Sequence, residues 1–253
     1  MKGIKRIVIH HLKELSIKKK DNLVVYSNLS SFGLKTKKIP QLVLSEIKKM
    51  IGPKGSLIMP AYILGVAPDF IYDVQKIHNC SSISNLTKYF FKKKNIIRSL
   101  NPIHNHIGFG HAAKFLKTSK FKSSYGFNSD FYFMKKKNFK LILLGCEPMQ
   151  GATYLHHLEC LLKVSYRKWI KIKKNILFKK KLINLNYNYY ALKNNNFVAN
   201  FNPVFNSLKK LGANIKSVRL KYGNSYSISF NDLDKYSRKI LKHNPYAFVK
   251  RIK

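Results

Sequence analysis

The stretch that most constrains the fold lies at Lys140–Cys146 and reads "KLILLGC". Its unbroken apolar run is typical of a strand that is buried on both faces, as in a largely parallel sheet. "NLVVYS" at residues 22–27 and "GSLIMP" at residues 55–60 predict two further strands. Apolar residues at helical spacing over 4–15 and 40–51 predict a helix before each of these strands. The residues alone therefore predict an α/β or α+β fold.

The chain changes character beyond Trp169. Residues 175–192, "NILFKKKLINLNYNYYAL", predict strands joined by turns, and residues 205–211 and 232–241 predict helices. We expect the N-cap of the last helix at Asn231 or Asp232. Because no internal repeat or long linker divides the sequence, we expect a single domain over 1–253. Residues 170–253 would then be a strand-rich and later helical extension of that domain.

The charge of the chain allows a nucleic-acid partner but does not require one. The formal net charge is +39, from 49 basic and 10 acidic residues. Only six of the basic residues are arginine, the side chain that nucleic-acid readers favour for its bidentate fork. Lysines spread along the whole chain are typical of a solvated surface. We expect attraction of anionic ligands and no specific nucleic-acid partner, with a lysine-rich nucleic-acid-binding protein as an alternative.

Cysteine usage and hydropathy indicate a cytoplasmic protein. Cys80, Cys146 and Cys160 are widely spaced, which argues against a disulfide framework or a Cys-x-x-Cys zinc site. The longest strongly apolar stretch, residues 56–68, contains two prolines and is shorter than the roughly 20 residues of a membrane helix. The apolar run at the N-terminus is too short for a signal peptide. We therefore expect neither export nor a membrane span.

Residues 152–159, "ATYLHHLE", are the strongest candidate for a catalytic site. They follow the strand at 140–146, and open α/β sheets place their sites at the carboxyl ends of central strands. A helix that begins near Thr153 puts Thr153, His156 and Glu159 on one face. His156 can take a proton near neutral pH, and Glu159 can orient its imidazole. The alternative is a helix with a buried, satisfied histidine and a surface glutamate.

Polar side chains gather in two other stretches. "SNLSSFG" at residues 27–33 follows a strand and offers hydroxyl and backbone donors to an anion such as a pyrophosphate. "RSLNPIHNHIGFG" at residues 98–110 holds an arginine, a serine and two histidines beside a proline. His104 and His106 could join His156 and Glu159 in a metal site, but with so few acidic residues we expect no metal. An ordinary polar turn is the alternative for each stretch.

The order and spacing of these stretches resemble the antibiotic acetyltransferase family, typified by aminoglycoside 3-N-acetyltransferases. The family patterns "VHSSLSSFG", "GTLVMPT", "RSxHPxxS", "FGxxS" and "ILLLG" correspond here to "VYSNLSSFG", "GSLIMPA", "RSLNPIHN", "YGFNS" and "LILLG". The pattern "TxxHxxE" corresponds to Thr153, His156 and Glu159, and the Tyr166–Arg167 pair and the ending "NPYAFVK" are similar too. The resemblance covers almost the whole chain. It implies the family's α/β fold, with a central, largely parallel or mixed sheet flanked by helices.

The resemblance also implies an activity, the transfer of an acetyl group from acetyl-CoA to an amine. His156 would be the general base that deprotonates the amine, and Glu159 would hold it. Coenzyme A would bind in a cleft formed by Ser27, Asn28, Ser30, Ser31, Gly33, Arg98, Ser99 and Thr153. Acetyl-CoA is then a co-substrate, and the partners are coenzyme A and a small amine.

Several positions depart from the family pattern. Lys37 and Lys38 stand where the family carries two glycines, and Tyr26 stands where it carries a histidine. Asn101 and Asn105 replace a histidine and a serine. Because the Thr-His-Glu pattern is kept, we expect an active enzyme with an altered acceptor site, and a non-catalytic relative is the alternative.

The acceptor amine is constrained by charge. Aminoglycosides are polycations, whose binding sites need carboxylates, and a chain of net charge +39 repels them at long range. The main candidate carboxylates are few: Asp69, Asp73, Asp130 and Glu147. We therefore expect an amino sugar or a related small amine as the acceptor, ahead of an aminoglycoside.

Overall fold

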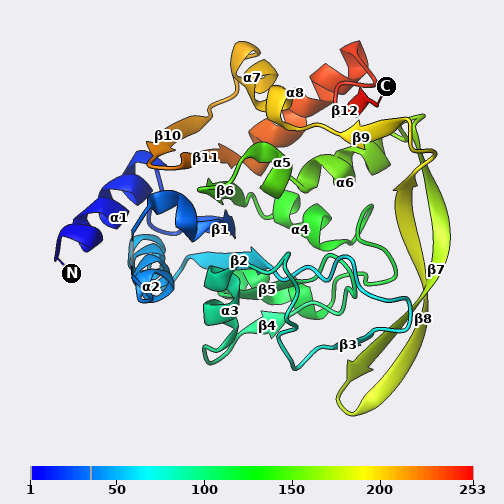
Figure 1. The fold of residues 1–253 in the computed structure, drawn as a ribbon, viewed down its shortest axis with the longest axis horizontal. Helices are drawn as coiled ribbons and strands as arrows, with labels where there is room; N and C mark the ends of the chain where they lie inside the picture. The colour runs from blue at the N-terminus through cyan, green and yellow to red at the C-terminus, as the bar shows by residue number, and fades with distance from the viewer. Residues whose placement is uncertain (1, 35, 253) are drawn as a thin grey trace.

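The computed structural model describes residues 2–34 and 36–252 and is built on a seven-stranded sheet of order β10-β11-β6-β1-β2-β5-β4 (Figure 1). The central strands β6 (Lys140–Leu144), β1 (Asn22–Ser27) and β2 (Ser56–Pro60) run parallel. The outer strands pair antiparallel and are β5 (His106–Phe109), β4 (Ile97–Arg98), β11 (Gly223–Ser229) and β10 (Lys216–Leu220). The expected α/β class with a mixed central sheet is confirmed.

Helices cover both faces of this sheet, as the unbroken apolar run at 140–144 predicts. Side chains alternate along a strand, so Leu141 and Leu143 join one hydrophobic cluster while Ile142 and Leu144 join the other. The second cluster includes buried side chains of α1 (Lys2–Glu14), α2 (Ile39–Ile51) and α3 (Asn85–Phe91). The first contains α4 (Asp130–Lys136), α6 (Tyr154–Leu161), α7 (Asn202–Lys210) and α8 (Phe230–His243).

The boundaries differ from the sequence expectations at two informative places. Strand β6 ends at Leu144, before the expected Cys146, because Gly145 adopts a left-handed φ of 69° that turns the chain. The expected N-cap at Asn231 or Asp232 is wrong. Strand β11 runs directly into α8, so Ser229 is the cap, and its hydroxyl accepts a hydrogen bond from the Asp232 backbone N–H at 3.0 Å.

The second half of the chain contains a long antiparallel hairpin of β7 (Arg167–Phe178) and β8 (Lys181–Leu192), which follows one side of the molecule (Figure 1). Strand β3 (Ile71–Asp73) adds to β7 in parallel, and a third hydrophobic cluster lies beneath them. The remaining elements are η1 (Leu29–Phe32), η2 (His111–Lys117), α5 (Pro148–Gly151), β9 (Phe197–Ala199) and β12 (Val249–Arg251). Within the described residues, no helix is both long and apolar enough to cross a membrane.

Candidate active site

Helix α6 is positioned by the turn that follows the central strand β6. Glu147 and Gln150 form a capping box at the start of α5, in which Gln150 Oε1 accepts from the Glu147 N–H at 2.9 Å. Helix α5 then passes so close to β1 that a Cβ on Gly151 would lie 2.5 Å from the side chain of Leu143 and 2.9 Å from that of Tyr26. Gly151 therefore lets α5 approach the sheet and start α6 directly above Tyr26.

His156 and Glu159 lie one turn apart on α6 and contact each other. His156 Nδ1 is 2.6 Å from Glu159 Oε2. The Glu159 side chain is fully buried, whereas that of His156 is 20% exposed, so the alternative of a buried histidine with a surface glutamate is wrong. Because Nδ1 is engaged by the carboxylate, Nε2 is the ring nitrogen that remains to take a proton.

Two further side chains hold the Glu159 carboxylate. The Tyr166 hydroxyl donates to Oε1 at 2.8 Å, and Arg167 Nε lies 2.7 Å from Oε2 in an ion pair whose N–H is not aligned for a hydrogen bond. Burial alone would raise the pKa of Glu159, but His156, Arg167 and Tyr166 together lower it below its usual value. Glu159 is therefore ionised at neutral pH and orients the imidazole of His156.

His156 faces a hollow of about 260 Å³ at the carboxyl edge of the sheet. The hollow is lined by aromatic, apolar and neutral polar side chains: Tyr26, Pro60, Tyr62, Leu64, Ser82, His104, Met149, Gln150, Thr153, His156 and Phe201. A larger cleft of about 490 Å³ adjoins it and shares Tyr26, Pro60, Ser82 and Gln150. The predicted base thus lies beside an open, two-part site.

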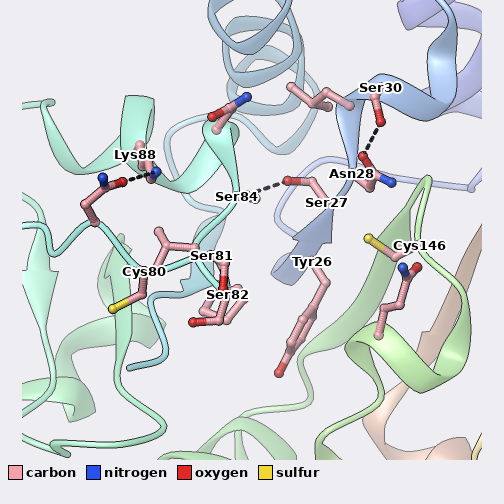
Figure 2. Close-up of a pocket in the computed structure, with 16 residues that line it drawn as sticks. Tyr26, Ser27, Asn28, Ser30, Cys80, Ser81, Ser82, Ser84, Lys88 and Cys146 are labelled. Carbon is pink, nitrogen blue, oxygen red and sulfur yellow. Dashed lines mark hydrogen bonds between the residues drawn. The ribbon is translucent and has the colours of Figure 1, made fainter. Parts of the chain in front are cut away.

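The larger cleft has two polar walls (Figure 2). On one wall are Ser27, Asn28 and Ser30, where the Ser30 hydroxyl donates to Asn28 Oδ1 at 2.6 Å. The opposite wall is residues 79–88, and the hydroxyls of Ser27 and Ser84 meet across the cleft at 2.9 Å. The sequence analysis missed this second wall, although three serines within residues 81–84, just before a helix, are a visible signal.

The other predicted ligands of coenzyme A line neither of the two cavities. The Ser31 hydroxyl donates to the Gly145 carbonyl, and Gly33 ends η1 with a φ of 66°. Arg98 is buried and donates from Nε to Asn105 Oδ1 at 2.9 Å, and the hydroxyl of Ser99 accepts from the His106 N–H. The structure brings Ser27, Asn28, Ser30 and Thr153 to the two-part site, while contacts of Ser31, Gly33, Arg98 and Ser99 with coenzyme A stay predictions.

The lysines that replace the family's two glycines lie apart from this site. Lys37 and Lys38 are exposed, and Lys38 lines a separate hollow between α1 and α2. The possible metal ligands do not converge either. In the described part of the chain, no group of three or more His, Cys, Asp or Glu side chains could hold a metal ion.

Three histidines are buried in the neutral state. Burial, and then the charge of nearby His156, lowers the pKa of His104 to about 3, and burial lowers that of His157 to about 3. Burial also lowers the pKa of His11 to about 4. Each of these side chains takes up a proton near pH 6.5 only when the chain unfolds.

We therefore expect the free energy of unfolding to fall as the pH drops from about 6.5 to about 4. The unfolded state binds more protons in this range, at up to about 1.4 kcal/mol per pH unit for each histidine. Urea unfolding at a series of pH values measures this slope. His157→Asn should reduce the slope of the unfolding free energy against pH by the contribution of one histidine. Equal slopes for the wild type and this variant would contradict the expectation.

Solved structures share this fold, and one of them is the aminoglycoside acetyltransferase AAC(3)-Xa. AAC(3)-Xa aligns with a TM-score of 0.82 at 14% identity, over 94% of this chain and 92% of that one. AAC-IIIb, solved with CoASH, aligns with a TM-score of 0.80 at 16% identity, over 94% of this chain and 96% of that one. The YokD protein from Bacillus subtilis aligns with a TM-score of 0.78 at 18% identity, over 95% of this chain and 99% of that one. No curated protein sequence matches the chain.

A family model, beyond the shared fold, defines the protein as an acyltransferase. The family model for aminoglycoside 3-N-acetyltransferases matches residues 24–242. The chain therefore belongs to the aminoglycoside 3-N-acetyltransferase family, and the resemblance found in its motifs is confirmed.

Proposed function

We propose that the protein is an acetyl-CoA-dependent N-acetyltransferase in which His156 is the general base. The contact of 2.6 Å between His156 Nδ1 and the buried Glu159 carboxylate carries this proposal. An amine must be neutral to attack a thioester, so a base is needed at neutral pH. His156 Nε2 removes the amine proton, and Glu159 stabilises the resulting imidazolium. The amine nitrogen bonds to the carbonyl carbon, the C–S bond breaks, and the leaving thiolate takes the proton that His156 removed from the amine.

Coenzyme A is proposed to occupy the larger cleft, with its thioester at the shared end near His156. The volume of about 490 Å³ suits an extended cofactor, and only one of the Ser27 and Ser84 hydroxyls donates in their mutual contact, which leaves the other to donate to a phosphate oxygen. Lys88 lines the cleft and adds a positive charge for those phosphates. In the solved AAC-IIIb complex the bound molecule is CoASH, which supports this choice of co-substrate.

The acceptor is proposed to be an amino sugar or a related small amine, for example an amino sugar carried on a nucleotide. The hollow beside His156 has no carboxylate among its described lining residues. The four candidate carboxylates lie elsewhere: Asp69 is exposed, Asp73 pairs with Lys76, Asp130 is buried against His106, and Glu147 binds Asn224 and Tyr226. A polycationic acceptor would therefore lack partners at this site.

The test compares amines in an assay of thiol release from acetyl-CoA, after calorimetry has established binding of acetyl-CoA. We expect a nucleotide-linked amino sugar to have a kcat/KM at least about tenfold above that of a kanamycin-type aminoglycoside, a difference of about 1.4 kcal/mol. Faster acetylation of the aminoglycoside would overturn the choice of acceptor. Steeply salt-dependent binding to duplex DNA, without binding of acetyl-CoA, would favour a nucleic-acid-binding protein.

We further propose that residues 1–253 form one acetyltransferase domain that works in the cytoplasm. Strands β10 and β11 extend the central sheet, which supports assigning residues 170–253 to the same domain. Cys80, Cys146 and Cys160 are free thiols, which supports a reducing compartment.

A further inference from the structure

A row of buried polar side chains, joined by hydrogen bonds, extends from α4 to the hollow beside His156. Asp130 Oδ2 lies 2.8 Å from His106 Nδ1, and His106 Nε2 lies 3.1 Å from the Tyr62 hydroxyl. The Tyr62 hydroxyl lies 2.5 Å from the hydroxyl of Tyr26. All four side chains are at most 6% exposed. Tyr62 and Tyr26 also line the hollow, so this row of side chains ends at the candidate active site.

A contribution to stability is a weak explanation for this row of buried polar side chains. A buried pair such as His106 and Asp130 rarely stabilises a fold more than apolar residues of the same volume would. The ring of Phe131 packs edge-on against His106, and the Ser119 hydroxyl donates to Asp130 Oδ1, so protein groups enclose the pair on all the sides that these contacts cover. A buried polar group of this kind that ends in a cavity indicates a function in that cavity.

Tyr26 lies at the junction of the two cavities, where the proposed binding of coenzyme A puts the thioester. The cleft proposed for coenzyme A and the hollow of His156 share Tyr26, Pro60, Ser82 and Gln150. Pro60 has no donor, and the Ser82 hydroxyl already donates to the Tyr62 carbonyl at 2.8 Å. Gln150 is exposed. Tyr26 is therefore the buried, fixed donor at the junction, which is the arrangement that stabilises developing charge most effectively.

The tyrosine hydroxyls keep their protons at neutral pH. Burial raises the pKa of Tyr26 to about 12, although hydrogen bonds with Tyr62 and Thr153 act in the opposite direction. Burial, followed by the charge of Tyr26, raises the pKa of Tyr62 well above its usual value. Both groups can therefore donate a hydrogen bond without losing the proton.

We propose that Tyr26 donates a hydrogen bond to the carbonyl oxygen of the thioester, and that Tyr62, His106 and Asp130 position this donor. This inference rests on the proposed acetyltransferase function. With a carbonyl oxygen as acceptor of the Tyr26 hydroxyl, Tyr62 donates to Tyr26, and His106, held between Tyr62 and Asp130, fixes the position of the Tyr62 hydroxyl. Negative charge that develops on the carbonyl oxygen as the amine attacks is stabilised by Tyr26, whose proton stays on the phenol.

The test measures the C=O stretching frequency of carbonyl-labelled acetyl-CoA bound to the protein, which falls when the oxygen accepts a hydrogen bond. We expect a lowered frequency in the wild type, its loss in Tyr26→Phe, and a partial loss in Asp130→Asn. With the best amine of the acceptor screen, Tyr26→Phe should lower kcat roughly 10²-fold and leave the KM for acetyl-CoA unchanged. Tyr154→Phe is the matched control, because it removes a buried tyrosine hydroxyl bonded to Asp234, away from the hollow.

The possible outcomes test this inference separately from the proposed acetyltransferase function. A lowered frequency that is lost in Tyr26→Phe and kept in Tyr154→Phe supports the inference. Bound acetyl-CoA with the same frequency in the wild type and Tyr26→Phe overturns the inference alone. No binding of acetyl-CoA to the wild type overturns the proposed function, and this inference with it.

Discussion

His156→Ala is expected to lower the rate of acetyl transfer by roughly 10²- to 10⁴-fold, the usual contribution of a general base. In the proposed mechanism the imidazole Nε2 accepts the proton of the amine, and alanine removes this acceptor. The variant should still bind acetyl-CoA, because His156 lines the hollow and not the larger cleft. Thiol release at saturating amine gives kcat, and calorimetry gives the dissociation constant of acetyl-CoA.

The neighbouring residue on α6 provides a control. His157 accepts a hydrogen bond from the Gly126 N–H and lies outside the lining of both cavities. His157→Asn should therefore keep its rate of acetyl transfer. If His156→Ala kept the wild-type rate, the assignment of the base would be wrong. If both variants and the wild type were inactive with every amine while acetyl-CoA still bound, a non-catalytic relative would be the better description.

The sequence predicted the parts of the site that depend on local spacing. His156 and Glu159 are three residues apart, so a helix alone brings them together, and the structure has them in contact. The strand predicted at 140–146, which the structure has over 140–144, was recognised because its apolar run has no polar side that could face solvent. Local periodicity is sufficient in both cases, since one element fixes the relation between the residues.

The sequence did not predict the parts that depend on contacts between distant elements. Tyr26 and Tyr62 are 36 residues apart, Tyr62 and His106 are 44 apart, and His106 and Asp130 are 24 apart. Their contact follows from the order of strands in the sheet, which no local pattern encodes. His106 instead entered the sequence analysis as a possible metal ligand, because the spacing of two histidines gives no information on their partners.

Glu159→Ala is expected to have the largest effect on stability, a loss of about 3–5 kcal/mol in the free energy of unfolding. Alanine would leave Arg167, whose side chain is only 8% exposed, as a buried charge without its partner. It would also remove the acceptor of the Tyr166 hydroxyl. Urea unfolding at neutral pH measures the change. Asp21→Ala breaks the more exposed pair with Lys140 and should cost less than about 1 kcal/mol, so equal losses in the two variants would contradict this expectation.

Glu159→Gln separates the charge of this side chain from its shape. His156, Arg167 and Tyr166 lower the pKa of the folded-state carboxyl below its unfolded value of about 4.3, against the opposing effect of burial. The stability that this charge contributes is therefore complete above about pH 4.3 and is lost as the pH falls through the folded-state pKa. We expect the wild type to show an additional loss of stability below about pH 4 that the glutamine variant lacks. Parallel stability curves of the two proteins in this acid range would mean that Glu159 is not ionised in the folded protein, and the imidazolium of His156 would then have no adjacent charge to stabilise it.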